Sequence, residues 1–442
     1  MKGFTINRNV FYSLALTTLL PFPAFVHADI NPDARRSIAV ASGGCGSTGT
    51  DTQCWQSAIN AAISSSTFAN VAATAGQVYT INDTIYVCGA RDGVIDGHGA
   101  QLQWNGGSGK PLFLVVGSYH IRFTNFTIRA NPGSPTALST AFEFTSAPTA
   151  SNPGSSSPTA TECPSGAPTV SSKNSIDHVV VEGTNSGGLG YGVRFSNRYG
   201  INGNDGINND MSVISDSNFF NVSTAVVSIE HSQSGQHRFI AMNGYGAINS
   251  SGTPSNSGCY VTASNGGEFT SVGGFQGSFG DANFCGNATS TILEPNSEGS
   301  NRMVRSTLQA YNVTGVPGRL IVEGGRFAVD GVNADGKFIS FNANGPVLIQ
   351  GLRVDGTPPS GAQPGIFLRP SGGTRAASAI VEGVSYYLNG VDATGWETLV
   401  VQQDVALREF GNLCTNSSGQ TLPCLAAKRP VYNDGYKTST VY

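Results

Sequence analysis

The chain has 442 residues, a formal net charge of −4 and 57 glycines, and only 12% of its residues are charged. Soluble domains are typically about 25% charged, and helical bundles and coiled coils need abundant Ala, Glu, Lys, Leu and Arg, so both classes are excluded. Hydrophobic residues make up 39% of the chain, which allows a large core and excludes wholesale disorder. An acidic chain also disfavours nucleic acid as the main partner, because phosphate binding requires a basic field.

The first 28 residues predict a secretory signal peptide. Lys2 and Arg8 provide a basic start, residues 10–20 are apolar, and Val26 and Ala28 supply the small residues of a cleavage site. We therefore expect a secreted protein, in the periplasm or outside the cell. No later segment is apolar enough to span a bilayer, so membrane insertion is not expected.

A short helix is predicted at about residues 52–65, with Asp51 or Thr52 as its cap. Its apolar side chains then fall on one face: Trp55, Ile59, Ala62 and Ile63. Almost all of the remaining chain consists of short β-branched runs separated by Gly, Asn and Ser.

These short runs resemble one another and predict a β-solenoid. They begin at Ile121, Val179, Val213, Phe239, Tyr260, Leu320, Val347 and Ile380. A spacing of roughly 20 to 35 residues with a strand in each unit is typical of a solenoid, in which stacking buries a continuous core. Turns between the rungs need positive φ, which explains the glycine and asparagine content. We expect the solenoid over residues 29–410, a Pro/Ser/Thr-rich loop at 131–175 and a C-terminal tail at 411–442.

Eight cysteines in a chain with an export signal predict disulfides. Proximity in the sequence favours three pairs and leaves a fourth: Cys45 with Cys54, Cys259 with Cys285, Cys414 with Cys424, and Cys88 with Cys163. Other connectivities remain open at this point. A zinc site is not expected, because no C-x-x-C motif is present.

Three segments near the N-terminus resemble the pectate-lyase-like superfamily. "GSTGTDTQCWQSAINAA" is similar to that group's opening motif, "GQVYTINDTIYV" to the strand pair that follows it, and "GVIDGHGAQLQW" to the first rung of polygalacturonase relatives. The resemblance implies an all-β, right-handed parallel β-helix whose N-terminal end is capped by the short helix. It implies function less sharply, since such folds include lyases, hydrolases, epimerases and non-catalytic binders.

The polygalacturonase motifs are only partly present. "NDGIN" retains Asn204 and Asp205, but Thr224 and Ala225 stand where the family has its Asp-Asp pair. Tyr245 replaces the histidine of the Gly-His-Gly motif, and no Arg-x-Lys motif follows. The acid and base of that family are missing as a set, so its ordinary mechanism is not expected.

The candidate catalytic residues come from the polar segment 191–245. Asp205 precedes the strand at Val213 by about the same distance as Glu230 and His231 precede the strand at Phe239. Because parallel strands stack about 4.8 Å apart, these side chains are expected to be neighbours on one face. A pair of carboxylates suits glycoside hydrolysis, and Arg or His suits β-elimination. The expected catalytic residues are Asp205, Glu230, His231, His237 and Arg238. The expected substrate-binding residues are Tyr191, Arg194, Tyr199, Asp210 and Tyr245.

Each candidate also has a structural interpretation. Asp205 suits an Asn-Asp-Gly turn, Glu230 suits a surface ion pair, and the aromatic side chains suit packing within the rungs. Several polar residues recur at the same place after a strand and are interpreted as structural side chains of the turns: Glu182, Asp216, Glu323, Gln350 and Glu382. Asp205 and Asp210 offer oxygen ligands, so calcium is an alternative, but no metal or other cofactor is expected.

Two functions remain open at the level of sequence. The first is a secreted enzyme that cleaves a polysaccharide by hydrolysis or β-elimination. The alternative is a non-catalytic glycan-binding or matrix protein with the same fold. In both cases the expected partner is a polysaccharide, and the protein is expected to be a monomer or a homotrimer.

Overall fold

The computed structural model describes a solenoid within the unit 37–442. The described residues are 37–40, 49–64, 70–130, 138–150, 154–164, 170–184, 188–201, 209–230, 234–248, 258–300, 302–307, 318–329, 339–342, 346–357, 366–369, 377–389, 398–400 and 405–424. The predicted signal peptide lies outside them. Among the described residues, no helix combines the length and the apolar character needed to cross a membrane.

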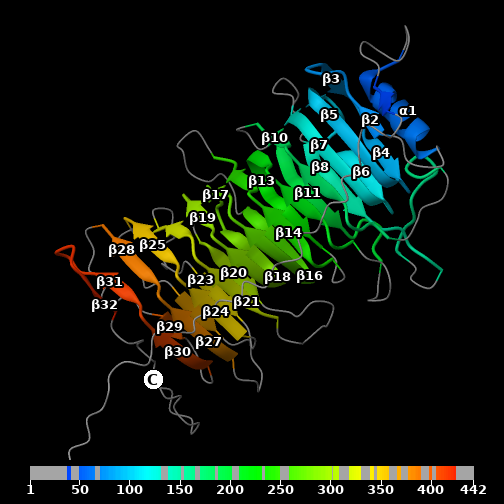
Figure 1. Ribbon diagram of the computed structural model, residues 1–442. Helices are drawn as coiled ribbons and strands as arrows, with labels where there is room; N and C mark the ends of the chain where they lie inside the picture. The colour runs from blue at the N-terminus through cyan, green and yellow to red at the C-terminus, as the bar shows by residue number, and fades with distance from the viewer. Residues whose placement is uncertain are drawn as a thin grey trace, which may run out of the picture. The chain divides into compact units, whose positions relative to one another are not determined.

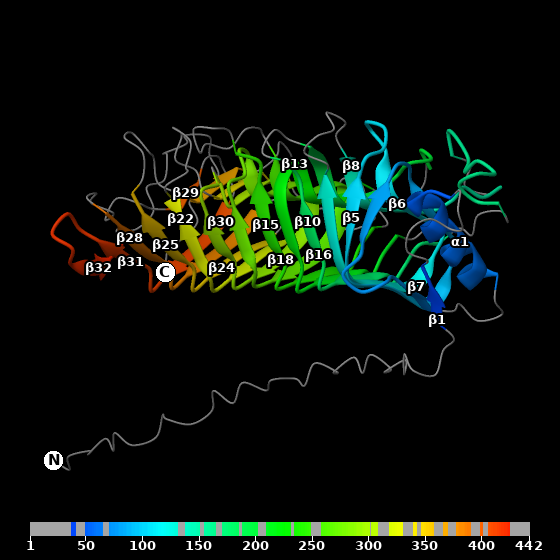
Figure 2. The same cartoon turned by 90° about the horizontal axis from the view of Figure 1, so that it is seen from above.

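The predicted helix is α1 (Asp51–Ile63), which lies at the β1 end of the stacked strands (Figure 2). Its cap is Thr50 rather than Asp51 or Thr52, because the Thr50 side chain and Gln53 form a reciprocal capping box. The helix buries five side chains over the end of the core: Cys54, Trp55, Ala58, Ile59 and Ala62. The predicted apolar face is thus confirmed except for Ile63, which is partly exposed.

The strands stack in chain order into three parallel rows, which confirms the parallel β-helix (Figure 1). Row 1 contains β1 (Ser37–Ala39), β2 (Asn70–Ala72), the first parts of β5 (Arg91–Trp104) and β7 (Tyr119–Ala130), β9 (Ser175–Asp177), β12 (Val213–Ser215), β14 (His237–Ile240), the second parts of β16 (Cys259–Val272) and β18 (Ala282–Leu293), β21 (Leu320–Glu323), β24 (Pro346–Gln350), β27 (Ala377–Glu382) and β30 (Val405–Phe410).

Row 2 contains β3 (Val78–Ile81), the second parts of β5 and β7, β10 (Val180–Glu182), the first part of β13 (Asn218–Ile229), β15 (Asn243–Gly246), β17 (Phe275–Gly277), β19 (Asn296–Glu298), β22 (Arg326–Ala328), β25 (Arg353–Gly356), β28 (Ser385–Leu388) and β31 (Leu413–Thr415). The short strand β32 (Thr421–Pro423) pairs with β31 in the antiparallel direction.

Row 3 contains β4 (Ile85–Cys88), β6 (Pro111–Val116), β8 (Leu138–Thr145), β11 (Leu189–Ser196), the second part of β13, the first parts of β16 and β18, β20 (Val304–Thr307), β23 (Ile339–Asn342), β26 (Ile366–Arg369) and β29 (Thr398–Val400). The chain therefore passes from row 1 to row 2 to row 3 in each rung.

Side chains that alternate inward from the strands form one continuous core. In row 1, Ile95, Phe123, Ile176, Ile214 and Phe239 follow one another in register, and each is almost fully buried. Because strand side chains alternate between faces, the residues on either side of these positions point outward. Function therefore has to be sought on the outer faces and in the turns.

The turn from row 1 to row 2 is short and uses the left-handed backbone conformation. Gly324, Gly351, Gly383 and Gly411 occupy it on four successive rungs, with φ between 62° and 69°. Earlier rungs place non-glycine residues such as Asn125 in the same conformation. The prediction that positive-φ turns explain the glycine and asparagine content is borne out here.

Three details differ from the sequence-based expectation. Strand β8 lies within the segment 131–175, which was predicted to be a loop. The runs predicted from Val179 and Tyr260 belong to rows 2 and 3, so the expected strands do not all mark the same row. Strand β31 continues row 2 beyond residue 410, where a tail was expected, because its backbone pairs with β28.

Three of the four predicted disulfides are present among the described residues: Cys88–Cys163, Cys259–Cys285 and Cys414–Cys424. Cys54 is also disulfide-bonded, and its predicted partner Cys45 lies outside the described residues.

Candidate functional site

The outer face of row 3 carries a cluster of charged side chains from consecutive rungs. Glu143 on β8 is in register with Arg194 on β11, which is in register with Ser228 on β13. Their neighbours Phe142, Val193 and Val227 point into the core, so these polar side chains point outward. We call the following residues the row 3 cluster: Glu143, Glu162, Tyr191, Arg194, Ser196, Arg198, Ser228 and Glu230.

Arg194 lies between two carboxylates in this cluster. Its Nε is 2.5 Å from Glu230 Oε1 and its second terminal nitrogen is 3.0 Å from Glu230 Oε2, which is a forked ion pair. The first terminal nitrogen lies 3.8 Å from Glu143 Oε1. Burial alone would lower the pKa of Arg194, but the hydrogen bonds and charge of Glu230 raise it. The guanidinium therefore remains charged and orients Glu230.

Glu143 is the buried anchor of the cluster, with only 1% of its surface exposed. It accepts a hydrogen bond from Ser196 Oγ at 2.8 Å and lies 3.3 Å from an Arg198 terminal nitrogen. Arg198 in turn reaches Glu162 at 3.4 Å. A buried carboxylate needs such partners, because an unpaired charge away from water is strongly disfavoured. Glu143 thus positions both arginines.

Tyr191 and Glu230 form the more accessible part of the cluster. The Arg194 guanidinium lies 5.4 Å from the centre of the Tyr191 ring, within the range of a cation–π contact. Partial burial raises the pKa of Tyr191, so its hydroxyl keeps its proton at neutral pH. Ser228 Oγ lies 3.2 Å from Glu230 Oε1. A phenol, a hydroxyl, a guanidinium and a carboxylate are thus presented together.

Two of the predicted catalytic residues lie away from this cluster. His237 is completely buried, stacks on Phe195 with ring centres 4.0 Å apart, and lies 2.9 Å from Ser234 Oγ through Nε2. Burial lowers the pKa of His237 to about 3, so it is a neutral core side chain and does not reach a substrate. Arg238 follows it on β14 and points outward from row 1, a different face from that of Glu230.

The predicted substrate-binding residues Tyr245 and Tyr199 are covered by other side chains of the protein. Tyr245 stacks between Phe220 and Phe275, with ring centres 5.1 Å and 4.9 Å away, so both of its faces are covered. Tyr199 is buried in an apolar layer outside row 3, and this burial raises its pKa. Neither ring offers a face to a sugar in this structure.

Asp210 lies just before β12 and is buried. Burial raises its pKa, and its backbone oxygen accepts a hydrogen bond from Lys173. Asp205 and His231 lie outside the described residues, so the predicted neighbourhood of Asp205 with Glu230, and the calcium alternative that rests on Asp205, remain predictions. Of the ten predicted site residues, the structure brings Tyr191, Arg194 and Glu230 together.

Sequence reasoning missed the acid that anchors the cluster. Glu143 stands between Phe142 and Phe144 in a segment that was assigned to a loop. The alternation Phe-Glu-Phe is itself a strand signal that places the acid on the opposite face from two core rings. Ser196 and Ser228 gave no such signal, because single serines are common in this chain.

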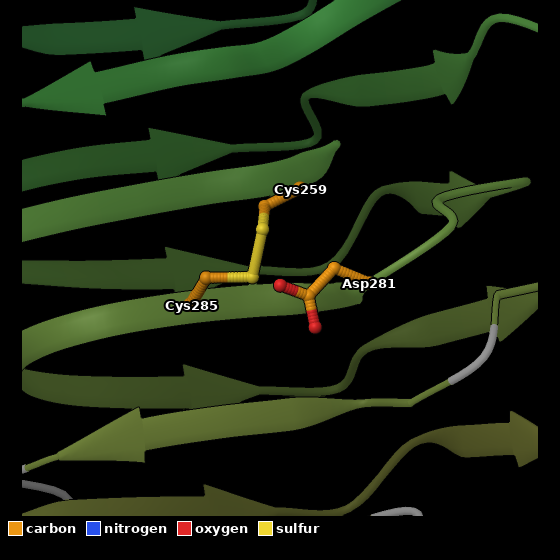
Figure 3. A group of neighbouring side chains, drawn as sticks. All are labelled: Cys259, Asp281 and Cys285. Carbon is orange, nitrogen blue, oxygen red and sulfur yellow. A yellow bond between two sulfur atoms is a disulfide. The ribbon is translucent and has the colours of Figure 1, made fainter. Parts of the chain in front are cut away.

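Asp281 lies beside Cys259 and Cys285, a grouping that resembles a metal site (Figure 3). The two sulfur atoms are bonded to each other, so neither is available as a thiolate ligand. Asp281 is instead paired with Arg305, whose Nε lies 2.6 Å from Oδ1. This grouping is therefore a disulfide next to an ion pair.

A pocket of about 570 Å³ lies between α1, the turn 82–84, β4 and residues 161–164. Most of its lining residues are of polar types, and they include Gln53, Asn60, Tyr86 and Glu162. Glu162 also contacts Arg198, so the pocket borders the row 3 cluster.

Neither a protein-family model nor a curated protein matches the sequence. Among solved structures, the Agl-KA catalytic domain matches with a TM-score of 0.51 and 11% identity, over 85% of this chain and 64% of that one. The A-module of the mannuronan C-5 epimerase AlgE6 from Azotobacter vinelandii matches with a TM-score of 0.38 and 10% identity, over 83% and 95%. ORF18 of Geobacillus virus E2 matches with a TM-score of 0.44 and 11% identity, over 86% and 64%. This chain thus spans 64% of the Agl-KA domain and of ORF18, and the Agl-KA match supports the fold.

Proposed function

We propose that the protein binds a polysaccharide along the outer face of row 3 and hydrolyses a glycosidic bond at the row 3 cluster. The observation that carries the proposal is the placement of Glu143 and Glu230 within 3.8 Å and 2.5 Å of one guanidinium, that of Arg194. Arg194 therefore orders both acids at one place on the outer face of row 3.

The two carboxylates are given different roles because their exposure differs. Glu230 has 22% of its side chain exposed and is the carboxylate that reaches the substrate. Glu143 is a positioning residue, because it is buried and acts through Arg194 and Arg198. Tyr191 provides a partly exposed ring and a hydroxyl for the sugar.

The charge of the row 3 cluster favours hydrolysis over β-elimination, and it favours a glycan without uronate groups as the substrate. Three carboxylates, from Glu143, Glu162 and Glu230, share the two guanidinium groups of Arg194 and Arg198. A uronate carboxylate would therefore meet a site that already holds more negative than positive charge. β-Elimination instead requires cations that neutralise that carboxylate.

A non-catalytic glycan-binding function is the second candidate. It is favoured by the pairing of each carboxylate in the row 3 cluster with an arginine, which is a common arrangement in structural ion-pair networks. The two candidates share the same face and differ in whether a bond is broken.

The proposal extends to where the protein acts. The disulfides among the described residues fit an oxidising compartment, and residues 1–28 supply the export signal. We therefore propose a secreted protein that acts on an extracellular polysaccharide, as a monomer or a homotrimer.

The test is incubation of the purified protein with pectic, alginate and neutral polysaccharides. We expect new reducing ends from a neutral glycan without absorbance at 235 nm, which would report unsaturated products of elimination. E230Q is expected to abolish the release, whereas E182Q retains it, because Glu182 pairs with Arg129 at 2.6 Å on row 2 and serves as a matched control. Binding without new reducing ends supports the second candidate, and activity that survives in E230Q overturns the site.

A further inference from the structure

The outer face of row 3 is closed on one side of the row 3 cluster. A second layer of apolar side chains covers the face there, and each is at most 5% exposed: Leu114, Val116, Ala147, Cys163, Tyr199 and Ile201. We call this layer the outer wall. Leu114 is in register with Glu143 on the next strand, so the wall begins one strand spacing, about 4.8 Å, from the cluster.

The outer wall is fastened to the solenoid by covalent and hydrogen bonds. The Cys88–Cys163 disulfide ties the segment around residue 163 to β4 across a sequence separation of 75 residues. The backbone oxygen of Tyr199 accepts hydrogen bonds from Ser155 Oγ and Ser156 N, both at 3.3 Å. The disulfide and the hydrogen bonds thus hold the outer wall against row 3.

On the other side of the cluster, row 3 has both exposed side chains and a small buried cluster of Cys259, Ala282 and Cys285. Ser228 is in register with Thr262, Thr262 with Cys285, and Cys285 with Arg305. Thr262 is partly exposed, and Ser264 and Arg305 are exposed. Hydroxyl groups hydrogen-bond to sugar hydroxyls, and Arg305, although paired with Asp281, keeps an exposed guanidinium.

We propose that the row 3 cluster receives the end of a polysaccharide chain and that the protein releases short products from that end. The outer wall blocks extension of the glycan past Glu143, so the remainder of the chain runs toward Thr262 and Arg305. This inference rests on the proposed function, and it adds the direction of the substrate and the mode of cleavage.

The primary test is the size of the first products formed from the polysaccharide that the protein cleaves. We expect a single short product class and a slow loss of solution viscosity relative to the release of reducing ends. A ladder of product lengths at early times overturns end recognition while leaving the proposed function intact. If no polysaccharide of the panel is cleaved, the proposed function is contradicted. The inference of cleavage from the chain end is then contradicted as well.

A second test opens the outer wall. In the double variant C88S/C163S the segment that carries Cys163 loses its tie to β4, so internal cleavage and a ladder of products are expected. The matched control is C414S/C424S, which removes a disulfide in the last rung and should keep the single product class. Identical single products from both variants, each folded by circular dichroism, overturn the role of the wall.

A third test does not depend on whether the variant C88S/C163S folds. R305W adds a large ring three strands from Ser228, and it is expected to raise KM for the polymer while leaving KM for the shortest cleaved oligosaccharide unchanged. N60W adds the same ring in the pocket beyond the wall, where Asn60 is exposed, and should change neither value. An effect of N60W that equals that of R305W contradicts the proposed direction of the glycan.

Discussion

Arg194 and Glu230 come from consecutive rungs and form a forked ion pair on the outer face of row 3. Their strands are in register, with Arg194 opposite Ser228, so Glu230 reaches back across the rung from the end of β13. A planar guanidinium fixes both oxygens of a carboxylate at once, which a flexible ammonium group cannot do. This pair therefore determines the orientation of the carboxylate that we assign to the substrate.

The first prediction is that R194K lowers kcat at least tenfold with a small effect on folding. Lysine retains the positive charge but loses the fork, so Glu230 is no longer held in one orientation. The measurement is kcat and KM on the glycan identified by the panel, with thermal unfolding in parallel.

R129K is the matched control for this substitution. Arg129 pairs with Glu182 on row 2 in a similar ion pair, so the same chemical change is made away from the cluster. Equal kinetic constants for R194K and the unaltered protein would contradict the orienting role of Arg194.

The second prediction concerns stability, and it separates Glu143 from Glu230. E143Q is expected to lower the free energy of unfolding by about 2 kcal/mol, because it removes a buried charge that holds two arginines. The value lies below the ~3–5 kcal/mol typical of a broken buried pair, because both arginines are about one-third exposed and regain water. Urea unfolding is the measurement, and E182Q is expected to change stability by less than ~0.5 kcal/mol.

The fold was predictable because periodic signals agree along much of the chain. Short apolar runs, glycine spacing and the α1 motif all point to stacked rungs, and the structure confirms them. The assignment of strands to rows was not predictable from the runs alone. In β16 and β18 the chain passes from row 3 to row 1 within one continuous strand, so Tyr260 resembles a row 1 start in sequence.

The site was only partly predictable because proximity in sequence is not proximity in a solenoid. His237 and Arg238 follow Glu230 by a few residues, yet one enters the core and the other faces outward from row 1. Glu143 lies much farther from Arg194 in the sequence. The two side chains are nevertheless neighbours, because β8 and β11 pair directly in row 3. Loop insertions of unequal length hide such neighbours from any fixed spacing.

The third prediction follows from the burial of His237. An unfolded histidine gains a proton near pH 6.5, whereas burial lowers the pKa of His237 to about 3 in the folded protein. Between these values the unfolded state binds more protons, so stability is fully present above pH 6.5 and falls as the pH decreases through this window. The loss from this group reaches roughly 3 kcal/mol at pH 4, at about 1.4 kcal/mol per pH unit.

The variant H237F tests the contribution of His237 to the loss of stability at low pH. Phenylalanine retains the stacking on Phe195 but has no proton to gain, so its unfolding free energy should depend less on pH between 6.5 and 4. The measurement is urea unfolding of both proteins at several pH values. Parallel curves for the two proteins would show that His237 does not contribute to acid sensitivity.

The fourth prediction compares two glycines in different turns between rows 1 and 2. G351A is expected to lower the unfolding free energy by about 1 kcal/mol, since φ is 65° and the nearest atom to an added Cβ is 3.9 Å away, which leaves only the cost of a left-handed alanine.

G274A is expected to lower the unfolding free energy by about 3 kcal/mol or more, because the same added atom would lie 2.0 Å from the backbone oxygen of Met242 and the rung below has to move. Urea unfolding of both variants measures the difference. Equal losses would mean that backbone conformation alone limits these turns, whereas a larger loss for G274A shows that close approach between rungs also requires glycine.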